Sequence, residues 1–163
     1  MRDILEILEK DATVTADEIA KMLNMTPKAV TSAIKKMEKD GVILKYKTVI
    51  NRELLDDGDE PECVRALIEV KVTPERTVGF DHIADRIYSF PEVKSCYLMS
   101  GTYDLLVIVE GTSLRSVAGF VSEKLSTIDN IRGTATHFIL KKYKEDGDIL
   151  KQPEKSKRPA IAL

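Results

Sequence analysis

The sequence has few of the residues that build cross-linked or reactive sites. Its 163 residues include no tryptophan, two cysteines and two histidines. The cysteines, Cys63 and Cys96, lie far apart and form no CxxC pair, so we expect reduced thiols that pack as small hydrophobic side chains. Two cysteines and two distant histidines also give no recognisable spacing of metal ligands. The sequence therefore predicts no disulfide framework, no metal and no cofactor.

Long apolar runs are missing as well. No stretch approaches the roughly 18 apolar residues of a membrane-spanning helix. The N-terminus, MRDILEILEK, is charged and amphipathic, which is not typical of a secretory signal. With 43% hydrophobic and 32% charged residues, the chain has the composition of a globular protein. We expect a cytoplasmic protein that forms one medium domain or two small ones.

A strong net charge is the third absence, because the formal charge is only −2 at pH 7. The distribution of the charge is more informative than its total. Residues 27–50 contain six lysines and two acidic residues, Glu38 and Asp40, which leaves a local charge of +4. Such a concentration of positive charge is typical of a surface that contacts phosphate groups.

The N-terminal third predicts three short helices. Apolar residues recur at helical spacing in the first, within DILEIL. Thr15 and Glu18 form a capping box, TADE, at the start of the second. Thr26 caps the third helix, Pro27 occupies its first position, and Gly41 ends it. The segment that follows, VILKYKTVI, looks extended.

The rest of the chain has another periodicity. The predicted elements are a strand over 64–72, a helix over 76–89, strands over 93–99 and 103–109 joined by a loop, a helix over 114–125 and a strand over 134–143. This β-α-β-β-α-β order indicates a ferredoxin-like sandwich. The predicted fold class is α+β, with an N-terminal helix-turn-helix (winged-helix-like) domain and a C-terminal ferredoxin-like βαββαβ sandwich.

Four regions are predicted along the chain. Residues 1–50 form the helix-turn-helix domain, and the acidic segment 51–62, NRELLDDGDEPE, forms a linker. Residues 63–144 form the ferredoxin-like domain, and residues 145–163 form a flexible tail. A sheet with helices on one face leaves its other face open, and an open apolar face favours pairing with a second copy. The outward positions are mixed, so the pattern supports oligomerisation without proving it.

The lysine-rich third helix has two interpretations. Its outward residues are Lys28, Thr31, Ser32 and Lys35, with Lys36 and Lys39 on the flank. In isolation the helix is typical of a solvated surface, because lysine favours helices and suits their C-terminal turn. A short turn joins it to a preceding helix, however, and this helix-turn-helix arrangement places the second helix in the major groove of DNA. We therefore expect the lysines to contact phosphate groups and the small polar residues to approach base edges.

The sequence also resembles a known family. TADEIAKMLNMTPKAVTSAIKKMEKDGVILKYKTVIN is similar to the DNA-binding module of the Lrp/AsnC (feast/famine) transcription regulators. FPEVKSCYLMSGTYDLLVIVEG and TATHFILKKYK resemble their effector-binding domain. The resemblance implies a sequence-specific regulator of double-stranded DNA that forms homodimers and higher oligomers such as octamers. One departure is that Ser32 and Ala33 stand where the family often has arginine, which shifts the expected contacts toward Lys28, Thr31 and Lys35.

The hairpin loop SGTYD is a second candidate site. From the residues alone, a glycine turn between strands needs no ligand, and its tyrosine is compatible with a core position. The resemblance implies that an amino-acid-like effector binds near this loop and the start of the last strand. The implied contact residues are Ser100, Gly101, Tyr103, Asp104, Thr134 and Thr136. Asp104 is a candidate partner for the effector's ammonium group, or alternatively a residue that caps the turn or cross-links the dimer.

Two other classes of protein are compatible with parts of the sequence. A nucleoid-type architectural protein would use the same basic helix with little sequence preference. An enzyme on a ferredoxin-like scaffold would need a nucleophile with its base, a metal cluster or a phosphate-binding loop, and none is recognisable. The sequence therefore predicts that the protein is not an enzyme.

Overall fold

The chain forms two compact units. The computed structural model describes residues 1–51, 63–74 and 79–150. The first unit, Met1–Asn51, is called the helical unit here, and the second, Arg52–Leu163, the sheet unit. From residue 52 onward the predicted linker lies outside the described residues, as do residues 151–163 of the predicted tail.

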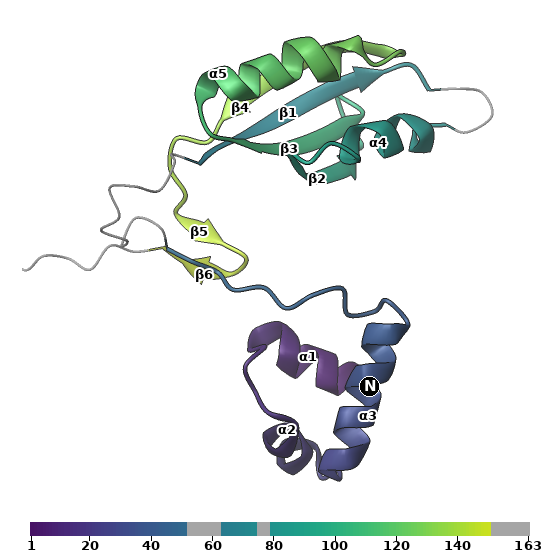
Figure 1. Ribbon diagram of the computed structural model, residues 1–163, viewed down its shortest axis with the longest axis vertical. Helices are drawn as coiled ribbons and strands as arrows, with labels where there is room; N and C mark the ends of the chain where they lie inside the picture. The colour runs from purple at the N-terminus through teal and green to yellow at the C-terminus, as the bar shows by residue number, and fades with distance from the viewer. Residues whose placement is uncertain (52–62, 75–78, 151–163) are drawn as a thin grey trace, which may run out of the picture. The chain divides into compact units, whose positions relative to one another are not determined.

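The helical unit contains the three predicted helices (Figure 1), which are α1 (Arg2–Lys10), α2 (Ala16–Leu23) and α3 (Pro27–Lys39). Their apolar faces meet in a small core formed by Ile4, Ile19, Ala20, Val30 and Met37. Asn24 adopts the left-handed conformation directly after α2, with φ 51°. This residue reverses the chain, so that α3 begins only three residues later.

Local side-chain caps fix where α2 and α3 begin. The Thr15 hydroxyl accepts a hydrogen bond from the Glu18 amide at 3.3 Å, and Glu18 Oε2 accepts one from the Thr15 amide at 2.8 Å. The Thr26 hydroxyl accepts from the Ala29 amide at 3.3 Å. Each cap satisfies N–H groups that have no partner inside the helix. The capping box and the threonine-proline start predicted from the sequence are confirmed.

The end of α3 also follows the prediction. Gly41 takes φ +72°, a conformation that favours glycine, and its amide donates to the Glu38 carbonyl at 3.2 Å. The described chain then continues through residues 43–50 without forming a strand. The segment predicted to be extended therefore pairs with no strand among the described residues of the helical unit.

The sheet unit has the predicted ferredoxin-like topology. Its elements are β1 (Val64–Val72), α4 (Asp81–Tyr88), β2 (Val93–Leu98), β3 (Leu105–Gly111), α5 (Leu114–Gly119) and β4 (Ile131–Phe138). The four strands pair in the order β2-β3-β1-β4, and all three pairings are antiparallel. Together with the helical unit, this sheet with its helices confirms the α+β fold class.

Both helices of the sheet unit cover one face of the sheet (Figure 1). On that face, Ile68, Val70, Leu105, Val107 and Val109 pack with Ile83 and Ile87 of α4 and with Phe120, Leu125 and Ile128 beyond α5. The register places Leu67 opposite Ile108 and Glu69 opposite Leu106, which are half-buried on the other face. Within the described residues no helix covers this open face.

The second helix of the sheet unit differs from the single long helix that the sequence predicts. After Gly119 the chain forms a π-helical turn, Phe120–Lys124, and then a 3-10 turn, Leu125–Thr127. The Ser122 hydroxyl donates to the carbonyls of Ala118 and Gly119 at 3.1 and 3.3 Å. Side chains that bond to their own backbone compete with regular helical bonding, which accounts for the change of pitch.

Other element boundaries also differ from the sequence predictions, and the strand expected over 103–109 is β3, Leu105–Gly111. The helix expected over 76–89 is α4, which begins only at Asp81, while residues 75–78 lie outside the described ranges. The last strand covers Ile131–Phe138 rather than 134–143. It ends early because its partner β1 begins at Val64, and the final bond of the pairing runs from the Ile139 amide to the Arg65 carbonyl at 2.9 Å.

The predicted flexible tail is wrong over its first residues. Strands β5 (Lys144–Glu145) and β6 (Asp148–Ile149) form a short hairpin. Its two turn residues, Asp146 and Gly147, both have positive φ, 47° and 96°, as a type I′ turn requires. The sequence contains this signal as an Asp-Gly pair, but the strands beside it are too short to show any periodicity.

Candidate DNA-binding face and effector loop

The outward face of α3 is basic. Val30 and Met37 are buried against α1 and α2, which fixes the face that the helix presents to solvent. All six residues predicted to contact DNA are exposed, namely Lys28, Thr31, Ser32, Lys35, Lys36 and Lys39. The exposed side of the helix also includes Ala29. The first turn carries no acidic side chain, so α3 presents its N-terminus and its lysines together.

Two hydrogen bonds modify this face. The Thr31 hydroxyl donates to the Pro27 carbonyl at 2.9 Å, so it is free to accept a bond from a base but not to donate one without rearranging. Glu38 is the one acidic residue within α3, and the Tyr46 hydroxyl donates to it at 3.0 Å. Partial burial and this bond to the carboxylate raise the pKa of Tyr46, so the hydroxyl keeps its proton.

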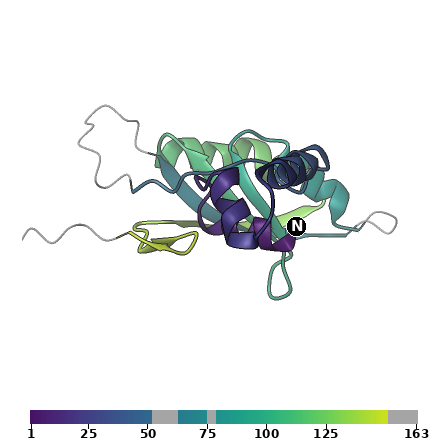
Figure 2. The same cartoon turned by 90° about the horizontal axis from the view of Figure 1, so that it is seen from below.

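The loop between β2 and β3 projects from the sheet (Figure 2) and carries four of the predicted effector residues. Ser100 and Gly101 are exposed, whereas Tyr103 and Asp104 are half-buried. The Asp104 amide donates to the Val70 carbonyl at 3.1 Å, and its Oδ2 accepts from the Val72 amide at 2.9 Å. Asp104 therefore fastens the loop to β1.

The carboxylate of Asp104 bonds just beyond the end of the β1–β3 pairing. That pairing ends at Val70 and Leu105, so the Val72 amide, which points to the same side of β1 as Val70, lies past the last pair of this ladder. Asp104 accepts this amide. The sequence left three roles open for Asp104, and this bond engages one of its carboxylate oxygens in a contact within the chain.

The other two predicted effector residues lie on β4. Thr134 pairs with Val70 and Thr136 with Ile68, so both threonines are on the helix-covered face and half-buried. The loop and Thr134 thus flank β1 from its two sides, and Thr136 lies two pairs further along. His137 points to the open face and lies 3.3 Å from Glu69. The structure thus brings the loop and Thr134 to one end of the sheet, with Thr136 nearer the middle of β1.

A shallow cavity of about 250 Å³ lies at the opposite end of the sheet and was not predicted. Its lining includes Glu92, Gly111 and Ser116. Glu92 pairs with Lys124, and the hydrogen bond from Lys124 lowers the pKa of the Glu92 carboxyl. Its Oε2 atom is buried without a hydrogen-bond partner among the described residues. No periodicity or motif in the sequence marks these residues.

The described residues contain no group of three or more histidine, cysteine or acidic residues positioned to hold a metal ion. Across the same ranges, none of the helices is both long and apolar enough to traverse a lipid bilayer.

Comparison with known families identifies both units. A family model described as a winged helix-turn-helix DNA-binding domain matches residues 1–43, and one described as the Lrp/AsnC ligand binding domain matches residues 65–149. The chain is therefore a DNA-binding transcriptional regulator that carries a ligand-binding domain. It belongs to the Lrp/AsnC family, whose members are regulators and not enzymes, and the family resemblance in its sequence is confirmed.

Two relatives illustrate how far the similarity extends. The chain is 48% identical over 160 residues to the uncharacterized HTH-type transcriptional regulator YugG of Bacillus subtilis, covering 98% of this chain and 95% of that protein. It is 32% identical over 140 residues to the regulator LysM of Saccharolobus solfataricus, covering 86% and 91%. The similarity therefore includes both the helical unit and the sheet unit.

Solved structures share the fold. The leucine response regulatory protein of Mycobacterium tuberculosis superposes with a TM-score of 0.70 at 25% identity, covering 92% of this chain and 97% of that one. A transcriptional regulator from Neisseria meningitidis, solved as a complex with L-methionine, gives a TM-score of 0.63 at 21% identity, covering 88% and 89%. At this identity the second comparison establishes the fold alone.

Proposed function

We propose that the protein is a sequence-specific transcriptional regulator that assembles as a homodimer or higher oligomer and responds to an amino-acid-like effector. The observation that carries the proposal is the fully exposed basic face of α3, presented by a capped helix-turn-helix in a chain whose other unit matches a ligand-binding domain. A protein of this kind acts where the chromosome is, so we assign it to the cytoplasm.

On DNA, α3 would enter the major groove. Lys28, Lys35, Lys36 and Lys39 would contact phosphate groups, while Thr31 and Ser32 lie near the start of the helix, where base edges are reached. The Thr31 hydroxyl, which already donates to Pro27, would accept a bond from a base amino group. One helical unit makes only a small number of these contacts with DNA. We therefore propose that binding needs two helical units on successive turns of the DNA.

A second copy would supply that partner through the sheet unit. The open face of the sheet carries Leu67, Leu106 and Ile108 at half-buried positions, together with the Glu69–His137 pair. Covering this face would remove its apolar side chains from water, which favours association. We propose that it joins two copies and that further contacts build a larger oligomer such as an octamer.

The effector would bind at subunit interfaces near the loop that contains Ser100, Gly101 and Tyr103. The backbone amides of an exposed glycine turn suit a carboxylate, and Thr134 and Thr136 supply hydroxyls. Asp104 would face the ammonium group with the part of its carboxylate that Val72 does not use. Two fold relatives, one named for its leucine response and one solved with L-methionine, support an amino acid as the class of ligand.

The effector would act through a difference in affinity. A ligand changes an equilibrium between two assemblies only if it binds one of them more tightly. A thermal-shift screen of the twenty amino acids on the full chain tests this part of the proposal. A concentration-dependent rise in the midpoint with at least one amino acid is expected, and the absence of any shift would contradict an amino-acid effector.

Sequence specificity is tested separately. Affinity for fragments upstream of the protein's own gene should exceed affinity for random DNA of equal length at the same salt concentration, typically by a factor of about 10³ or more. Equal affinity for every fragment would contradict the specific regulator and favour a nucleoid-type architectural protein. A salt series on both kinds of fragment separates phosphate contacts from base contacts.

A further inference from the structure

The chain that follows α3 is attached to the end of that helix. The amides of Val42 and Ile43 both donate to the Met37 carbonyl, at 2.8 and 3.1 Å, and Gly41 donates to Glu38. The Ile43 side chain packs against the core of the helical unit. Residues 41–43 are therefore held by backbone bonds and by apolar contact, although the segment forms no strand.

A side-chain bond attaches the same segment to α3 a second time. The Tyr46 hydroxyl donates to Glu38 at 3.0 Å across eight residues of sequence. On a helix, residues separated by three, four or seven positions share one side, so Thr31, Lys35 and Glu38 form one stripe. Two of these residues, Thr31 and Lys35, belong to the predicted DNA-binding face. Tyr46 therefore holds its segment along the flank of that face.

The residues on either side of Tyr46 are both lysines. Lys45 and Lys47 are exposed, and they account for two of the six positive charges between residues 27 and 50. The family model for the DNA-binding domain ends at residue 43, before either of them. The bond from Tyr46 also engages Glu38, the one acidic side chain of α3, beside the phosphate-contacting lysines.

We propose that Lys45 and Lys47 form a second phosphate-contacting element beside α3, and that Tyr46 positions it by bonding to Glu38. This inference rests on the proposed DNA binding by α3 and extends it to a segment outside the helix-turn-helix. Lys45 and Lys47 contact the DNA backbone next to the groove that α3 enters. Tyr46 is a positioning residue, since it acts through the lysines beside it. The element adds affinity and salt dependence without reading the sequence.

The experiment measures the affinity of the full chain for one duplex over a series of salt concentrations. The logarithm of the affinity falls linearly with the logarithm of the salt concentration, and the steepness of this line is the salt slope. The double variant K45A/K47A should lower the salt slope by about 0.9 for each phosphate group that is no longer neutralised. The control R2A/K10A removes the same charge from α1 of the same unit, where both residues are exposed. It should change the slope distinctly less. Equal slopes for the two double variants would overturn the proposal.

Tyr46 is tested by a double-mutant cycle. Y46F keeps the ring and removes the hydrogen bond, so it should weaken binding several-fold in the wild-type chain. In the K45A/K47A background it should have no further effect, because no lysines remain to be positioned. A decrease of the same size in both backgrounds would overturn the positioning role. Circular dichroism should show unchanged helix content in every variant, because the substituted side chains are all exposed.

The variant K28A/K35A separates this inference from the proposed function. If it loses affinity and slope while K45A/K47A behaves like the α1 control, DNA binding by α3 stands and the second element is refuted. If neither K28A/K35A nor K45A/K47A changes the slope, binding by α3 itself is refuted, and this inference is refuted with it.

Discussion

The helical unit and the sheet unit differ in what determines their structure. Among the described residues, the main buried cluster of the helical unit contains five, and caps within three residues of sequence fix the starts of α2 and α3. The main buried cluster of the sheet unit contains eleven described residues, brought together by strands that pair across 30 residues or more. The helical unit, which presents the basic face, is thus stabilised mainly by interactions between residues close in sequence, and it buries fewer apolar side chains than the sheet unit. The unit with the larger core holds the predicted effector loop.

The largest predicted effect comes from removing one fully buried side chain from each core. Met37 and Ile68 are both 0% exposed. Replacing either with alanine should cost about 2–5 kcal/mol. Because its core is small, the helical unit should lose its folded state in Met37→Ala, whereas the sheet unit should remain folded in Ile68→Ala.

Amide NMR spectra of the full chain check this difference unit by unit. Leu140→Ala serves as the control, because Leu140 is 96% exposed and its removal should change stability by less than about 0.5 kcal/mol. If the helical unit tolerates Met37→Ala as well as the sheet unit tolerates Ile68→Ala, the contrast between the two cores is wrong.

A second prediction concerns close packing in the sheet unit. A Cβ atom at Gly111 would lie 2.5 Å from Ser116 Oγ and 2.9 Å from Val117 Cγ2. Gly111→Ala should therefore destabilise the sheet unit by about 1–3 kcal/mol, because it displaces the cap of α5. At Gly119 nothing lies within 4 Å of the added atom, so Gly119→Ala should be neutral or stabilising. Urea unfolding of both variants measures the difference.

A third prediction concerns the capping box of the helical unit. Thr15→Ala removes the acceptor for the Glu18 amide and should cost about 1 kcal/mol, whereas Thr15→Ser keeps an acceptor and should cost much less. Hydrogen bonds from the Thr15 amide and hydroxyl lower the pKa of Glu18. Alanine leaves the amide but removes the hydroxyl, so the pKa of Glu18 should move part of the way back. Thermal unfolding and carboxyl NMR titration provide the two readouts, and equal stability of the two variants would refute the cap.

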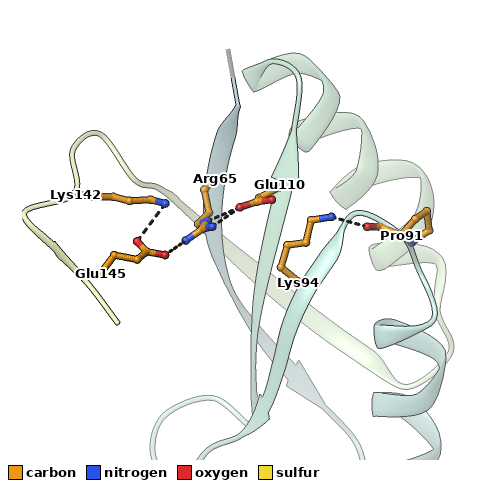
Figure 3. A network of polar contacts seen from close by, with 6 residues as sticks. All are labelled: Arg65, Pro91, Lys94, Glu110, Lys142 and Glu145. Carbon is orange, nitrogen blue, oxygen red and sulfur yellow. Dashed lines mark hydrogen bonds and ion pairs between the residues drawn. The ribbon is translucent and has the colours of Figure 1, made fainter. Parts of the chain in front are cut away.

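The smallest effect is predicted for the C-terminal hairpin. Arg65 on β1 contacts Glu110 on β3 and Glu145 on β5, and Lys142 also pairs with Glu145 (Figure 3). Burial raises the pKa of Glu145, but the bonds from Arg65 and Lys142 outweigh it and the net shift is downward. Arg65 is 24% exposed and Glu110 and Glu145 are each 22% exposed, so solvent screens the network in part and its contribution to global stability should be small.

The pH dependence of this hairpin follows from the direction of the shift. A carboxyl with a lowered folded-state pKa stabilises the hairpin above its unfolded pKa of 4.5, and this contribution is lost as the pH falls through the lower folded value. NMR signals of Tyr143 and Leu150, whose backbones pair at 3.0 Å, should therefore change below pH 4.5. Glu145→Gln should remove this transition, and its persistence in the variant would show that another group is responsible.

The same contrast between local and long-range interactions determines what could be predicted from the sequence. The helices, their caps and Gly41 were predictable because each signal lies within a few residues of its effect. The identity of the strands was also predictable, from alternation. The end of β4 was not, because it depends on where β1 begins. The bond between Asp104 and Val72 depends on where the pairing of β1 with β3 ends, which only the paired strands reveal.

The candidate sites were predictable to different degrees. Helical periodicity alone placed all six predicted DNA-contacting residues on the exposed face of α3. It could not show that Tyr46 reaches back to Glu38, because the chain between them has no regular period. The residues assigned to the effector came from family resemblance. The strand order places the loop and Thr134 on the two sides of β1 at one end of the sheet.

The central claim is that the α3 lysines contact phosphate groups. The most direct test is the salt dependence of DNA affinity for the wild-type chain and for K28A/K35A/K36A, with fluorescence anisotropy on one duplex. We predict weaker binding to every DNA sequence, and a slope of log affinity against log salt concentration that falls by about 0.9 for every phosphate group that no longer meets a lysine. An unchanged slope would show that these lysines form only a solvated face and do not contact phosphate groups.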